Sequence, residues 1–422
     1  MKTYLVGGAV RDELLGRPVA DRDWVVIGAT PEILLEQGYQ QIGNDFPCFL
    51  HPQTKEEYAL ARTEKKSGKG YTGFICDFGP EITLEEDLSR RDLTINAIAK
   101  SPDGNYIDPY QGMADLENKI LRHVSPAFVE DPLRVLRVAR FAARYAQLGF
   151  SVHPETLALM NQLVEQGELA ELTAERVWKE MFRALTEVRP SAFFRVLRQC
   201  GALKVLLPEL DCLFGIPQPE QHHPEVDTGE HVMLVIDEAK QRFDNPLVTW
   251  AALLHDLGKG LTPKDEWPRH IRHEIKGVPL VEQVCQRYKV PKDFKALAML
   301  VSEHHLRCHI LLDMKAKSVF RLLEVLDGVR RPERVIYFSQ TCEADARGRT
   351  GLSDRDYPQS ELLVRCNHAA RSVDIKPLLE QGYQGLQLAE HIRRLRITEV
   401  KRCLSLWKKQ RKNDKTREIA DE

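Results

Sequence analysis

Short apolar runs alternate with glycine turns at the start of the chain, which is the pattern of a small sheet. Residues 4–6 form an apolar run that ends at two glycines, and residues 11–16 favour a short helix that Gly16 ends. Residues 24–27 are β-branched and aromatic, as in a buried strand, and residues 57–62 are predicted to form another strand. The pattern therefore predicts strand, glycine turn, short helix and strand.

The periodicity becomes helical from residue 84. Leu84, Leu88 and Ile95 recur at helical spacing, so residues 84–97 are predicted to form one helix that packs on the sheet. In residues 131–146, arginines lie within an arc of roughly 120° on one helix face, with apolar residues opposite: Arg134, Arg137, Arg140 and Arg144. A stripe of this kind is often a solvated surface. Here few carboxylates follow Asp131 to neutralise it, which favours an anionic ligand.

Amphipathic helices continue to the end of the chain, and a proline-rich stretch at residues 208–224 indicates a linker. A length of 422 residues predicts two to four domains. We expect an α+β protein with a small mixed-sheet head at residues 1–122, a helical neck and body at 123–215, a second all-α domain at 216–350 and a helical C-terminal region at 351–422. Within the last region, residues 408–422 are expected to be a solvated or disordered tail.

Composition narrows the class of protein. Hydrophobic residues make up 43% and charged residues 29%, as in an ordinary soluble protein. No membrane-spanning run and no signal peptide are expected, and nine scattered cysteines without a Cys-x-x-Cys pair favour reduced thiols in the cytoplasm. Since the net charge is −2, a polyanionic partner would need a local basic surface.

The first stretch also carries candidate chemistry. Gly7 and Gly8 allow backbone N–H groups to approach a polyphosphate. Asp21 and Asp23 are two residues apart, so on an extended strand both carboxylates point to one face, where they suit Mg²⁺. An isolated Asp-x-Asp pair usually lies in a solvated turn. Whether this pair is catalytic is therefore judged from the other motifs that occur in order with it.

Two further features could serve phosphates. Residues 65–73 are rich in glycine and lysine without apolar periodicity, which predicts a mobile loop that is either functional or merely solvated. Arg91 offers a guanidinium fork for triphosphate oxygens. Its alternative is an ion pair with Glu86 or Asp87.

Four motifs occur in order along the first half of the chain: Gly7-Gly8-Ala9-Val10-Arg11-Asp12, Asp21-Arg22-Asp23, Arg90-Arg91-Asp92 and Glu130-Asp131-Pro132-Leu133-Arg134. This half resembles the class II tRNA nucleotidyltransferases and the related bacterial poly(A) polymerases. The resemblance implies two catalytic Mg²⁺ ions on Asp21 and Asp23. It implies nucleotide binding by Gly8, Arg11, Arg91, Asp131, Arg134, Arg137 and Arg140, with Asp131 and Arg134 reading the base by hydrogen bonds.

A second constellation follows the linker: Thr228-Gly229-Glu230-His231, His255-Asp256-Leu257-Gly258-Lys259, Glu303-His304-His305 with His309, and Glu343-Ala344-Asp345. Imidazoles with carboxylates suit a transition metal. This part resembles the HD phosphohydrolases, which implies metal ligation by His231, His255, Asp256, His305 and Asp345. His304 and His309 compete with His305, while His222, His223, His270 and His273 are expected on the surface or near the substrate.

A head of the first type fused to an HD domain resembles the bacterial CCA-adding tRNA nucleotidyltransferases. That resemblance implies addition of CCA to tRNA from CTP and ATP. It also implies HD-domain phosphatase, 2′-nucleotidase and 2′,3′-cyclic phosphodiesterase activity with Ni²⁺ or another transition metal. The expected protein is mainly a monomer, or a homodimer. The alternatives are a poly(A) polymerase with a degenerate HD domain and a non-catalytic tRNA-binding protein.

Overall fold

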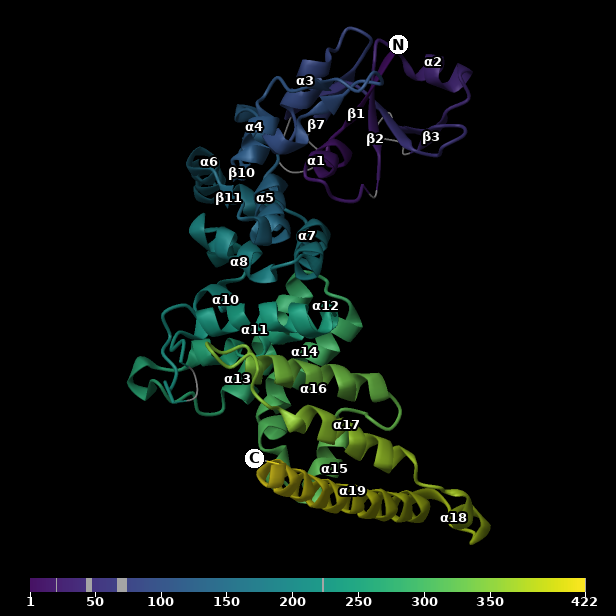
Figure 1. The fold of residues 1–422 in the computed structure, drawn as a ribbon, viewed down its shortest axis with the longest axis vertical. Coiled ribbons are helices and arrows are strands. Elements are labelled where there is room, and N and C mark those ends of the chain that lie inside the picture. The colour runs from purple at the N-terminus through teal and green to yellow at the C-terminus, as the bar shows by residue number, and fades with distance from the viewer. Residues whose placement is uncertain (20, 43–47, 67–73, 222–223, 422) are drawn as a thin grey trace. The chain divides into compact units, whose positions relative to one another are not determined.

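The computed structural model describes residues 1–422 except Ala20, 43–47, 67–73, 222–223 and Glu422, and it describes no side chains at 64–66, 74–76 and 414–421. The chain divides into two units, Met1–Leu206 and Leu207–Glu422 (Figure 1). Most of the predicted loop at residues 65–73, and both His222 and His223, lie outside the described residues. Each unit is considered by itself below.

Unit 1 contains a mixed seven-stranded sheet in the order β3-β4-β5-β2-β1-β8-β9. Strands β1, β2 and β5 form its centre, because β1 pairs antiparallel with β2 and β2 pairs parallel with β5. The seven strands are β1 (Lys2–Val6), β2 (Asp23–Ile27), β3 (Gln40–Ile42), β4 (Cys48–Leu50), β5 (Glu57–Leu60), β8 (Ala99–Lys100) and β9 (Tyr106–Ile107). Two smaller sheets pair β6 (Arg62–Lys66) with β7 (Phe74–Phe78) and β10 (Ile120–Leu121) with β11 (Ser151–Val152).

Alternation along the central strands gives the sheet two packed faces. Val6 and Val25 belong to one core cluster, while Val26 belongs to the cluster on the other side with Leu34 and Phe49. Successive residues of a strand point to opposite faces, so adjacent valines serve both clusters. The head is thus a sheet packed on both faces, which agrees with the prediction of a buried strand at residues 24–27.

From α4 onward, most of the chain is helical. Helices also complete unit 1. They are α1 (Gly8–Leu14), α2 (Pro31–Glu36), α3 (Leu84–Ser89), α4 (Gly112–Glu117), α5 (Leu133–Tyr145), α6 (Pro154–Glu165), α7 (Ala174–Thr186), α8 (Pro190–Gln199) and α9 (Ala202–Leu206). Gly16 follows α1 with φ of 65°, which confirms it as the residue that ends this helix.

The predicted helix at residues 84–97 is wrong in its length. A capping box between Thr83 and Glu86 starts α3, but the helix ends at Ser89. Asp92 then accepts hydrogen bonds from its neighbour's backbone at Leu93 (2.9 Å) and from the side chain of Asn96 (2.8 Å). These local bonds compete with helical ones, so the segment folds as a bend and a single 3₁₀ turn.

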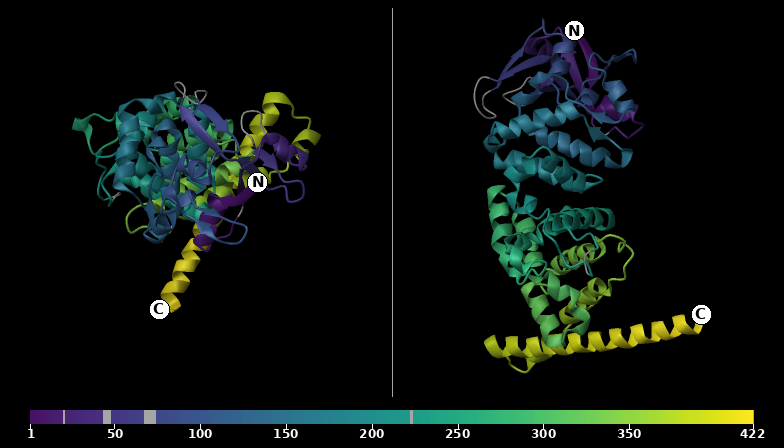
Figure 2. Two further views of the ribbon diagram at one scale, coloured as in Figure 1. Left: turned by 90° about the horizontal axis from the view of Figure 1, so that it is seen from above. Right: turned by 90° about the vertical axis from the view of Figure 1, so that its left-hand side faces the viewer.

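Unit 2 is helical throughout its described residues, and the α+β fold class is confirmed. Its helices are α10 (Pro208–Asp211), α11 (Thr228–Phe243), α12 (Pro246–Leu254), α13 (His273–Arg287), α14 (Lys292–His309), α15 (Ala316–Val325), α16 (Pro332–Arg347), α17 (Pro358–Arg371), α18 (Lys376–Glu380) and α19 (Gly385–Asp421). The backbone of α19 is one long helix to Asp421 (Figure 2). Of the two alternatives for residues 408–422, the disordered tail is therefore wrong, whereas the exposed side chains of Lys408 and Lys409 agree with a solvated one. Among the described residues, no helix combines the length and apolarity that a membrane span needs.

Candidate active sites

The first candidate site lies where β1 ends. Val6 pairs in register with Asp23, the first residue of β2, so the turn after β1 lies beside the Asp23 strand end. Gly7 has φ of 69°, a left-handed conformation that favours glycine. A Cβ there would stand 3.0 Å from a guanidinium nitrogen of Arg91, so the absent side chain also makes room for that arginine. The glycine turn brings backbone, carboxylate and cation together.

These groups line a cavity of about 360 Å³. Of the nine residues that the resemblance assigns to this site, six line the cavity: Gly8, Arg11, Asp23, Arg91, Arg134 and Arg137. Arg90 joins them, so five guanidinium groups face two carboxylates, Asp23 and Asp92. This excess of positive charge suits a polyphosphate. Asp21, Asp131 and Arg140 are not among the described residues that line the cavity.

Arg91 combines the two roles that the sequence left open. Its guanidinium forms an ion pair with Asp87 at 3.2 Å, and the same side chain lines the cavity. Its Nε atom is buried and makes no hydrogen bond to any described residue. A buried donor without an acceptor is costly, so the site has an unmet demand for an anionic or carbonyl oxygen.

Two further arginines, Arg11 and Arg137, are held in place by protein partners. Arg11 donates to Asn96 Oδ1 at 2.5 Å, and its guanidinium lies 5.2 Å from the ring centre of Phe141. Arg137 forms an ion pair with Asp92 at 2.6 Å. Burial alone would raise the pKa of Asp92, but Arg137 and the Asn96 hydrogen bond hold it far below its usual range. The cationic wall is therefore pre-ordered by hydrogen bonds.

The negative charge of Asp21 acts on the neighbouring Asp23 carboxylate. Desolvation raises the pKa of Asp23 above its usual value, the negative charge of Asp21 adds to this, and Arg91 opposes it. Glu57, which the sequence did not single out, stands on β5 in register with Asp23. Residues in register on neighbouring strands point to the same face, so a third carboxylate lies at this strand end. A divalent cation would relieve the repulsion among these carboxylates.

The residues assigned to base reading make protein contacts. Arg134 donates to the backbone oxygens of Ala127 (2.8 Å) and Arg90 (2.5 Å), which ties α5 to the segment after α3. Asp131 accepts from the guanidinium of Arg176 at 3.0 Å. Arg176 belongs to α7, and sequence reasoning gave it no role. The Asp131 carboxylate is thus already oriented by a cation from another helix.

Arg140 differs from its neighbours on α5. Its guanidinium is buried and lies 2.7 Å from a Glu180 oxygen and 3.3 Å from a Glu187 oxygen. In this structure it ties α5 to α7 and to the chain just after α7. Nucleotide contact by Arg140 remains a prediction, with an ion-pair role as its competitor.

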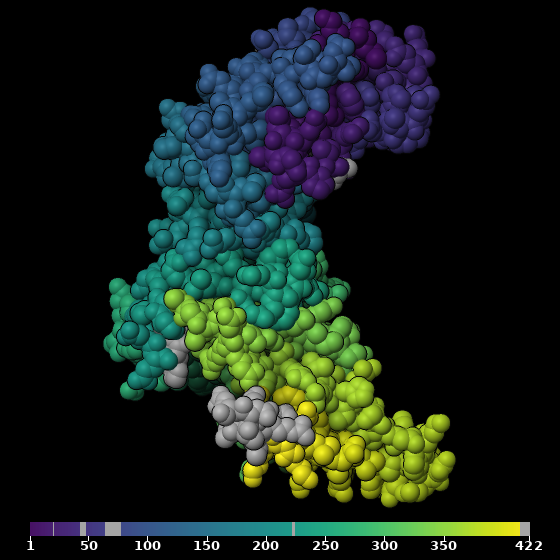
Figure 3. All heavy atoms as spheres, viewed as in Figure 1, coloured from purple at the N-terminus to yellow at the C-terminus, as the bar shows by residue number. Residues whose placement is uncertain are grey.

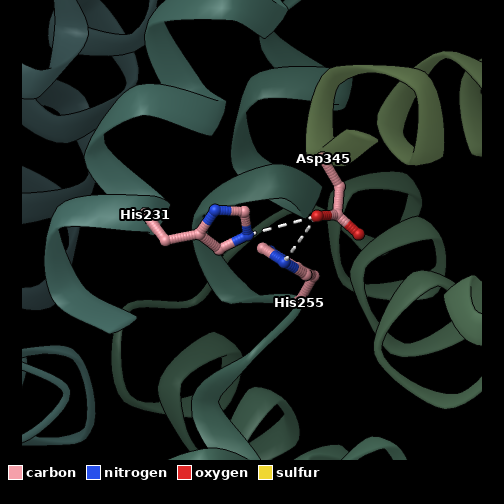
Figure 4. A group of neighbouring side chains, drawn as sticks. All are labelled: His231, His255 and Asp345. Atoms are coloured by element: carbon pink, nitrogen blue, oxygen red, sulfur yellow. Dashed lines mark hydrogen bonds and ion pairs between the residues drawn. The ribbon is translucent and has the colours of Figure 1, made fainter. Parts of the chain in front are cut away.

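The second candidate site lies in unit 2, where four helices converge. His231 comes from α11, His255 directly follows α12, His305 comes from α14 and Asp345 comes from α16. All four are at least nine-tenths buried. Figure 4 shows the rings of His231 and His255 facing the Asp345 carboxylate, with Nε2–Oδ1 separations of 3.1 and 3.9 Å. Donor atoms of these three residues lie within 4.8 Å of one another, the spacing of a metal site.

Asp256 belongs to a second group of donor atoms with His273 and His305. Its Oδ1 lies 3.2 Å from His273 Nε2 and 3.8 Å from His305 Nε2. Its Oδ2 lies 3.1 Å from His255 Nε2 on the first group's side. One carboxylate thus faces both groups. His273, expected on the surface or near the substrate, is buried and is the residue that sequence reasoning missed as a donor.

Gly258 explains how His273 reaches the site. A Cβ on Gly258 would lie 2.0 Å from the backbone oxygen of His273 and 2.6 Å from the nitrogen of Gly277. Only glycine allows the 3₁₀ turn after Asp256 to pack this closely against α13. The glycine of the His255–Lys259 motif therefore brings a fourth histidine to the metal groups.

The three competing histidines of α14 have separate surroundings. His305 Nε2 faces Asp256, while His309 Nε2 contacts Asp345 Oδ2 at 2.7 Å. His309 Nδ1 contacts the hydroxyl of Tyr357 at 2.8 Å, and the ion-pair contact of His304 is with Glu303 at 3.7 Å. His304 therefore faces away from the two donor groups.

The protonation of these groups suits metal binding. Burial lowers the pKa of His305 to about 3, so its ring is neutral near pH 7. Its Nδ1 donates to the carbonyl oxygen of Val301, which leaves a lone pair on Nε2. Burial would raise the pKa of Asp256, but His255 and Lys259 lower it well below its usual value. Burial would lower the pKa of His255, but Asp256 raises it, so this ring would give up its proton when a divalent metal binds. Neutral imidazole and ionised carboxylate are the ligand forms that a divalent metal needs.

Two buried donor atoms indicate that a divalent metal would fit this second site. His255 Nε2 and Asp256 Oδ1 are buried and make no hydrogen bond to described residues; their polar contacts there are ion pairs. His255 Nδ1 meanwhile donates to the Ala252 carbonyl at 2.7 Å, which aims Nε2 at the centre. Donor atoms without hydrogen bonds at the focus of three imidazoles and two carboxylates fit a divalent metal site.

A cavity of about 200 Å³ opens onto the second group. Lys259 lies in its wall and contacts Asp256 Oδ2 at 2.6 Å and Gln218 Oε1 at 2.5 Å. Arg349 also lines the cavity and lies 3.3 Å from Asp345. Cations beside metal-type donors suit a phosphate ester, and Gln218 is a lining residue for which the sequence offered no signal.

Comparisons with known families match three parts of the chain. The model of the poly A polymerase head domain matches residues 3–122. A model described as a probable RNA and SrmB-binding site of polymerase A matches residues 149–213. The HD domain model matches residues 228–343. The fold and its two sites thus define a poly A polymerase-type head joined to an HD domain.

Curated relatives narrow this class to one family. A multifunctional CCA protein of Ectopseudomonas mendocina (strain ymp) is 60% identical over 402 residues, which is 95% of this chain and 98% of that protein. A multifunctional CCA protein of Pseudomonas fluorescens (strain Pf0-1) is 58% identical over 401 residues, with the same two coverages. The chain belongs to the family of multifunctional CCA proteins.

Solved structures agree on the fold. A CCA-adding enzyme in an apo form is 21% identical and superposes with a TM-score of 0.65. The match covers 95% of this chain and 88% of that enzyme's chain. The Thermotoga maritima CCA-adding enzyme complexed with tRNA is 20% identical and has a TM-score of 0.61. The match covers 96% of this chain and 90% of that enzyme's chain.

Proposed function

We propose that this enzyme adds C, C and A to the 3′ end of tRNA from CTP and ATP, without a nucleic-acid template, and releases pyrophosphate. The observation that carries the proposal is the cavity where Asp23 meets five arginines, in a chain of this family. Relatives of the same fold have been solved with CTP and with ATP. Cytoplasmic location and a mainly monomeric state belong to the same proposal.

The residues around the cavity divide the work of phosphoryl transfer. Asp21 and Asp23 would hold two Mg²⁺ ions, and these cations would supply acidification of the 3′-hydroxyl and neutralisation of the pyrophosphate charge. Gly8 offers its backbone, and Arg11 and Arg91 clamp phosphates or ribose. Phosphoryl transfer asks mainly for positioning and charge stabilisation, so this small polar set is sufficient.

Base choice is assigned to Asp131 and Arg134, with Arg137 and Arg140 near the nucleotide. A carboxylate and a guanidinium together offer acceptors and donors for the edge of cytosine and then adenine. The ion pair of Arg176 with Asp131 and the backbone bonds of Arg134 support this role, because a reading group must be held rigidly. The tRNA itself is expected to be recognised by shape and backbone.

For the HD domain, we propose hydrolysis of phosphate esters at tRNA 3′ ends, as 2′,3′-cyclic phosphodiesterase, 2′-nucleotidase and phosphatase. His231, His255, Asp256, His305 and Asp345 would hold Ni²⁺ or another transition metal, which acidifies an attacking water. Lys259 and Arg349 would bind the phosphate. The shared position of Asp256 between two donor groups supports two cations rather than one, with His273 completing the second group.

One experiment separates the proposed function from its alternatives. The enzyme is incubated with tRNA that lacks CCA and with CTP and ATP, and the tRNA 3′ ends are sequenced. We expect products that stop after CCA. A ladder of added adenosines would favour the poly(A) polymerase alternative, and unchanged tRNA would favour a binding protein.

Asp131→Ala and Arg134→Ala should weaken discrimination of CTP and ATP against UTP and GTP by about a hundredfold or more, because a matched polar edge is lost. Selectivity is measured as kcat/KM for each of the four nucleotides. Arg183→Ala is the comparison variant, because Arg183 on α7 pairs with Glu180 at 3.7 Å and is not assigned to the nucleotide, so selectivity should be retained. Equal loss of rate for all four nucleotides in Asp131→Ala would assign Asp131 a structural role.

His273→Ala should halve the transition-metal content of the HD site. The measurement is Ni²⁺ stoichiometry by titration calorimetry, in a background with Asp21→Ala and Asp23→Ala so that the head contributes no cation site. We expect two ions per chain without His273→Ala and one with it. A stoichiometry of one in both proteins would support a single cation.

A further inference from the structure

Two cysteines far apart in the sequence meet in unit 2, and neither belongs to the donor groups of the HD site. Cys366 lies on α17 and Cys403 on α19, and their sulfur atoms are 3.9 Å apart. Figures 1 and 2 show the two helices packed alongside each other. A disulfide bond needs a separation of about 2.0 Å, so a shift of about 2 Å between the two side chains would join them.

The two thiols differ in exposure. Cys366 is buried, whereas Cys403 is half-buried and lines a cavity of about 330 Å³. α19 lies on the surface of unit 2 (Figure 3), and its Leu406 is 58% exposed. A small oxidant can therefore reach Cys403 first, with Cys366 directly behind it.

Basic side chains and one carboxylate line the cavity beside Cys403, because Glu399 in its wall pairs with Arg402 at 2.8 Å. Arg365 and Arg402 both line it, and Arg365 lies 4.8 Å from the ring centre of Trp407 in the same wall. The hydrogen bond with Cys366 and these two positive charges lower the pKa of Cys403 to about 7, while the same hydrogen bond and burial raise the pKa of Cys366. A thiolate at the surface with a protonated thiol beside it is the arrangement of an attacking and a resolving cysteine.

A second pair of neighbouring cysteines provides an internal contrast. Cys308 and Cys342 are both fully buried, and burial together with a hydrogen bond between them raises the pKa of Cys342 well above its usual value. Burial also raises the pKa of the separate thiols Cys200 and Cys285 to about 11. The raised pKa values keep Cys342, Cys200 and Cys285 protonated at neutral pH, and all four thiols are buried, so proximity alone does not make a reactive pair.

We propose that Cys366 and Cys403 form a reversible thiol–disulfide site that reacts with peroxides. The Cys403 thiolate attacks one peroxide oxygen, the O–O bond breaks, and the leaving hydroxide takes a proton to become water. The Cys366 thiol then loses its proton and attacks the sulfur of the Cys403 sulfenic acid. The S–S bond forms as the S–O bond breaks, and a second water leaves. Two thiols lose two electrons, which reduce one peroxide to two waters.

The test treats the whole reduced protein with stoichiometric hydrogen peroxide and counts free thiols in denaturant. We expect two of the nine thiols to disappear and one peptide pair, containing Cys366 and Cys403, to be cross-linked by mass spectrometry. Dithiothreitol should restore both thiols. A cross-link between two copies of the chain, or loss of thiols at other positions with Cys366 and Cys403 intact, would overturn the proposal.

Three variants assign the roles. Cys366→Ser should stop the reaction at a Cys403 sulfenic acid that dimedone traps, and Cys403→Ser should prevent loss of Cys366. Cys342→Ser, in the buried pair, should leave the disulfide unchanged. Cys403 should also react with iodoacetamide at neutral pH about tenfold faster than an unperturbed thiol. If Cys366→Ser yielded no trapped sulfenic acid, Cys403 would not be the attacking thiol.

Discussion

Asp23→Ala is expected to lower the rates of both C and A addition by at least about a thousandfold, since both steps would use the same carboxylates and cations. Asp23 stands at the start of β2 beside the glycine turn, and burial, together with the charge of Asp21, raises its pKa. The repulsion between the two carboxylates is what a bound cation relieves. Single-turnover transfer of labelled CMP and of labelled AMP, each to the appropriate tRNA end, measures the two steps separately.

The control for this prediction is Glu36→Ala, which removes an exposed carboxylate at the end of α2 in the same unit. It should leave both rates near normal. Hydrolysis of 2′,3′-cyclic phosphate by Asp23→Ala should also be unchanged, because the HD donors come from other elements. Substantial CMP transfer by Asp23→Ala would contradict the two-cation assignment.

The arginine stripe of α5 shows how far sequence reasoning reached. Helical spacing located the helix and put its arginines on one face. It could not show that their carboxylate partners come from distant positions: Asp92 for Arg137, Glu180 for Arg140 and Asp12 for Arg144. Few carboxylates follow Asp131 along the helix itself, as expected. The stripe is nevertheless neutralised in the folded protein, because carboxylates from other elements pair with it. Periodicity reports which face a residue takes, whereas its partners depend on tertiary packing.

The HD site shows the same limit. The adjacent His255 and Asp256 are visible in the sequence because both positions are local. His273 carries no such signal, since it reaches Asp256 only through the close approach of Gly258 to α13. In the head, the local sequence pattern predicted the strands and the glycine turn, whereas the pairing that sets Asp23 beside Gly7 is seen only in the structure. Local motifs were predictable, and donors delivered by helix packing were not.

His255→Ala should eliminate 2′,3′-cyclic phosphodiesterase and phosphatase turnover while CCA addition stays near normal. His255 Nε2 is buried between Asp256 at 3.1 Å and Asp345 at 3.9 Å, and removing it takes one nitrogen donor from the focus of the site. Nitrogen donors favour Ni²⁺, Co²⁺ or Mn²⁺ over Mg²⁺. Added Ni²⁺ should therefore stimulate the wild type and not the variant, and a chelator should reduce the wild type to the level of the variant.

A pair of neighbouring histidines on α14 provides the matched control. His305→Ala should lose hydrolysis as His255→Ala does, because its Nε2 faces Asp256. His304→Ala removes an equally large ring one position away that faces Glu303, so a folded variant should retain hydrolysis and the Ni²⁺ response. Thermal unfolding of each variant excludes loss of fold as the cause. If His255→Ala hydrolysed cyclic phosphate as fast as wild type, the HD assignment would be wrong. If folded His255→Ala lost CCA addition instead, the two activities would depend on one another through the chain.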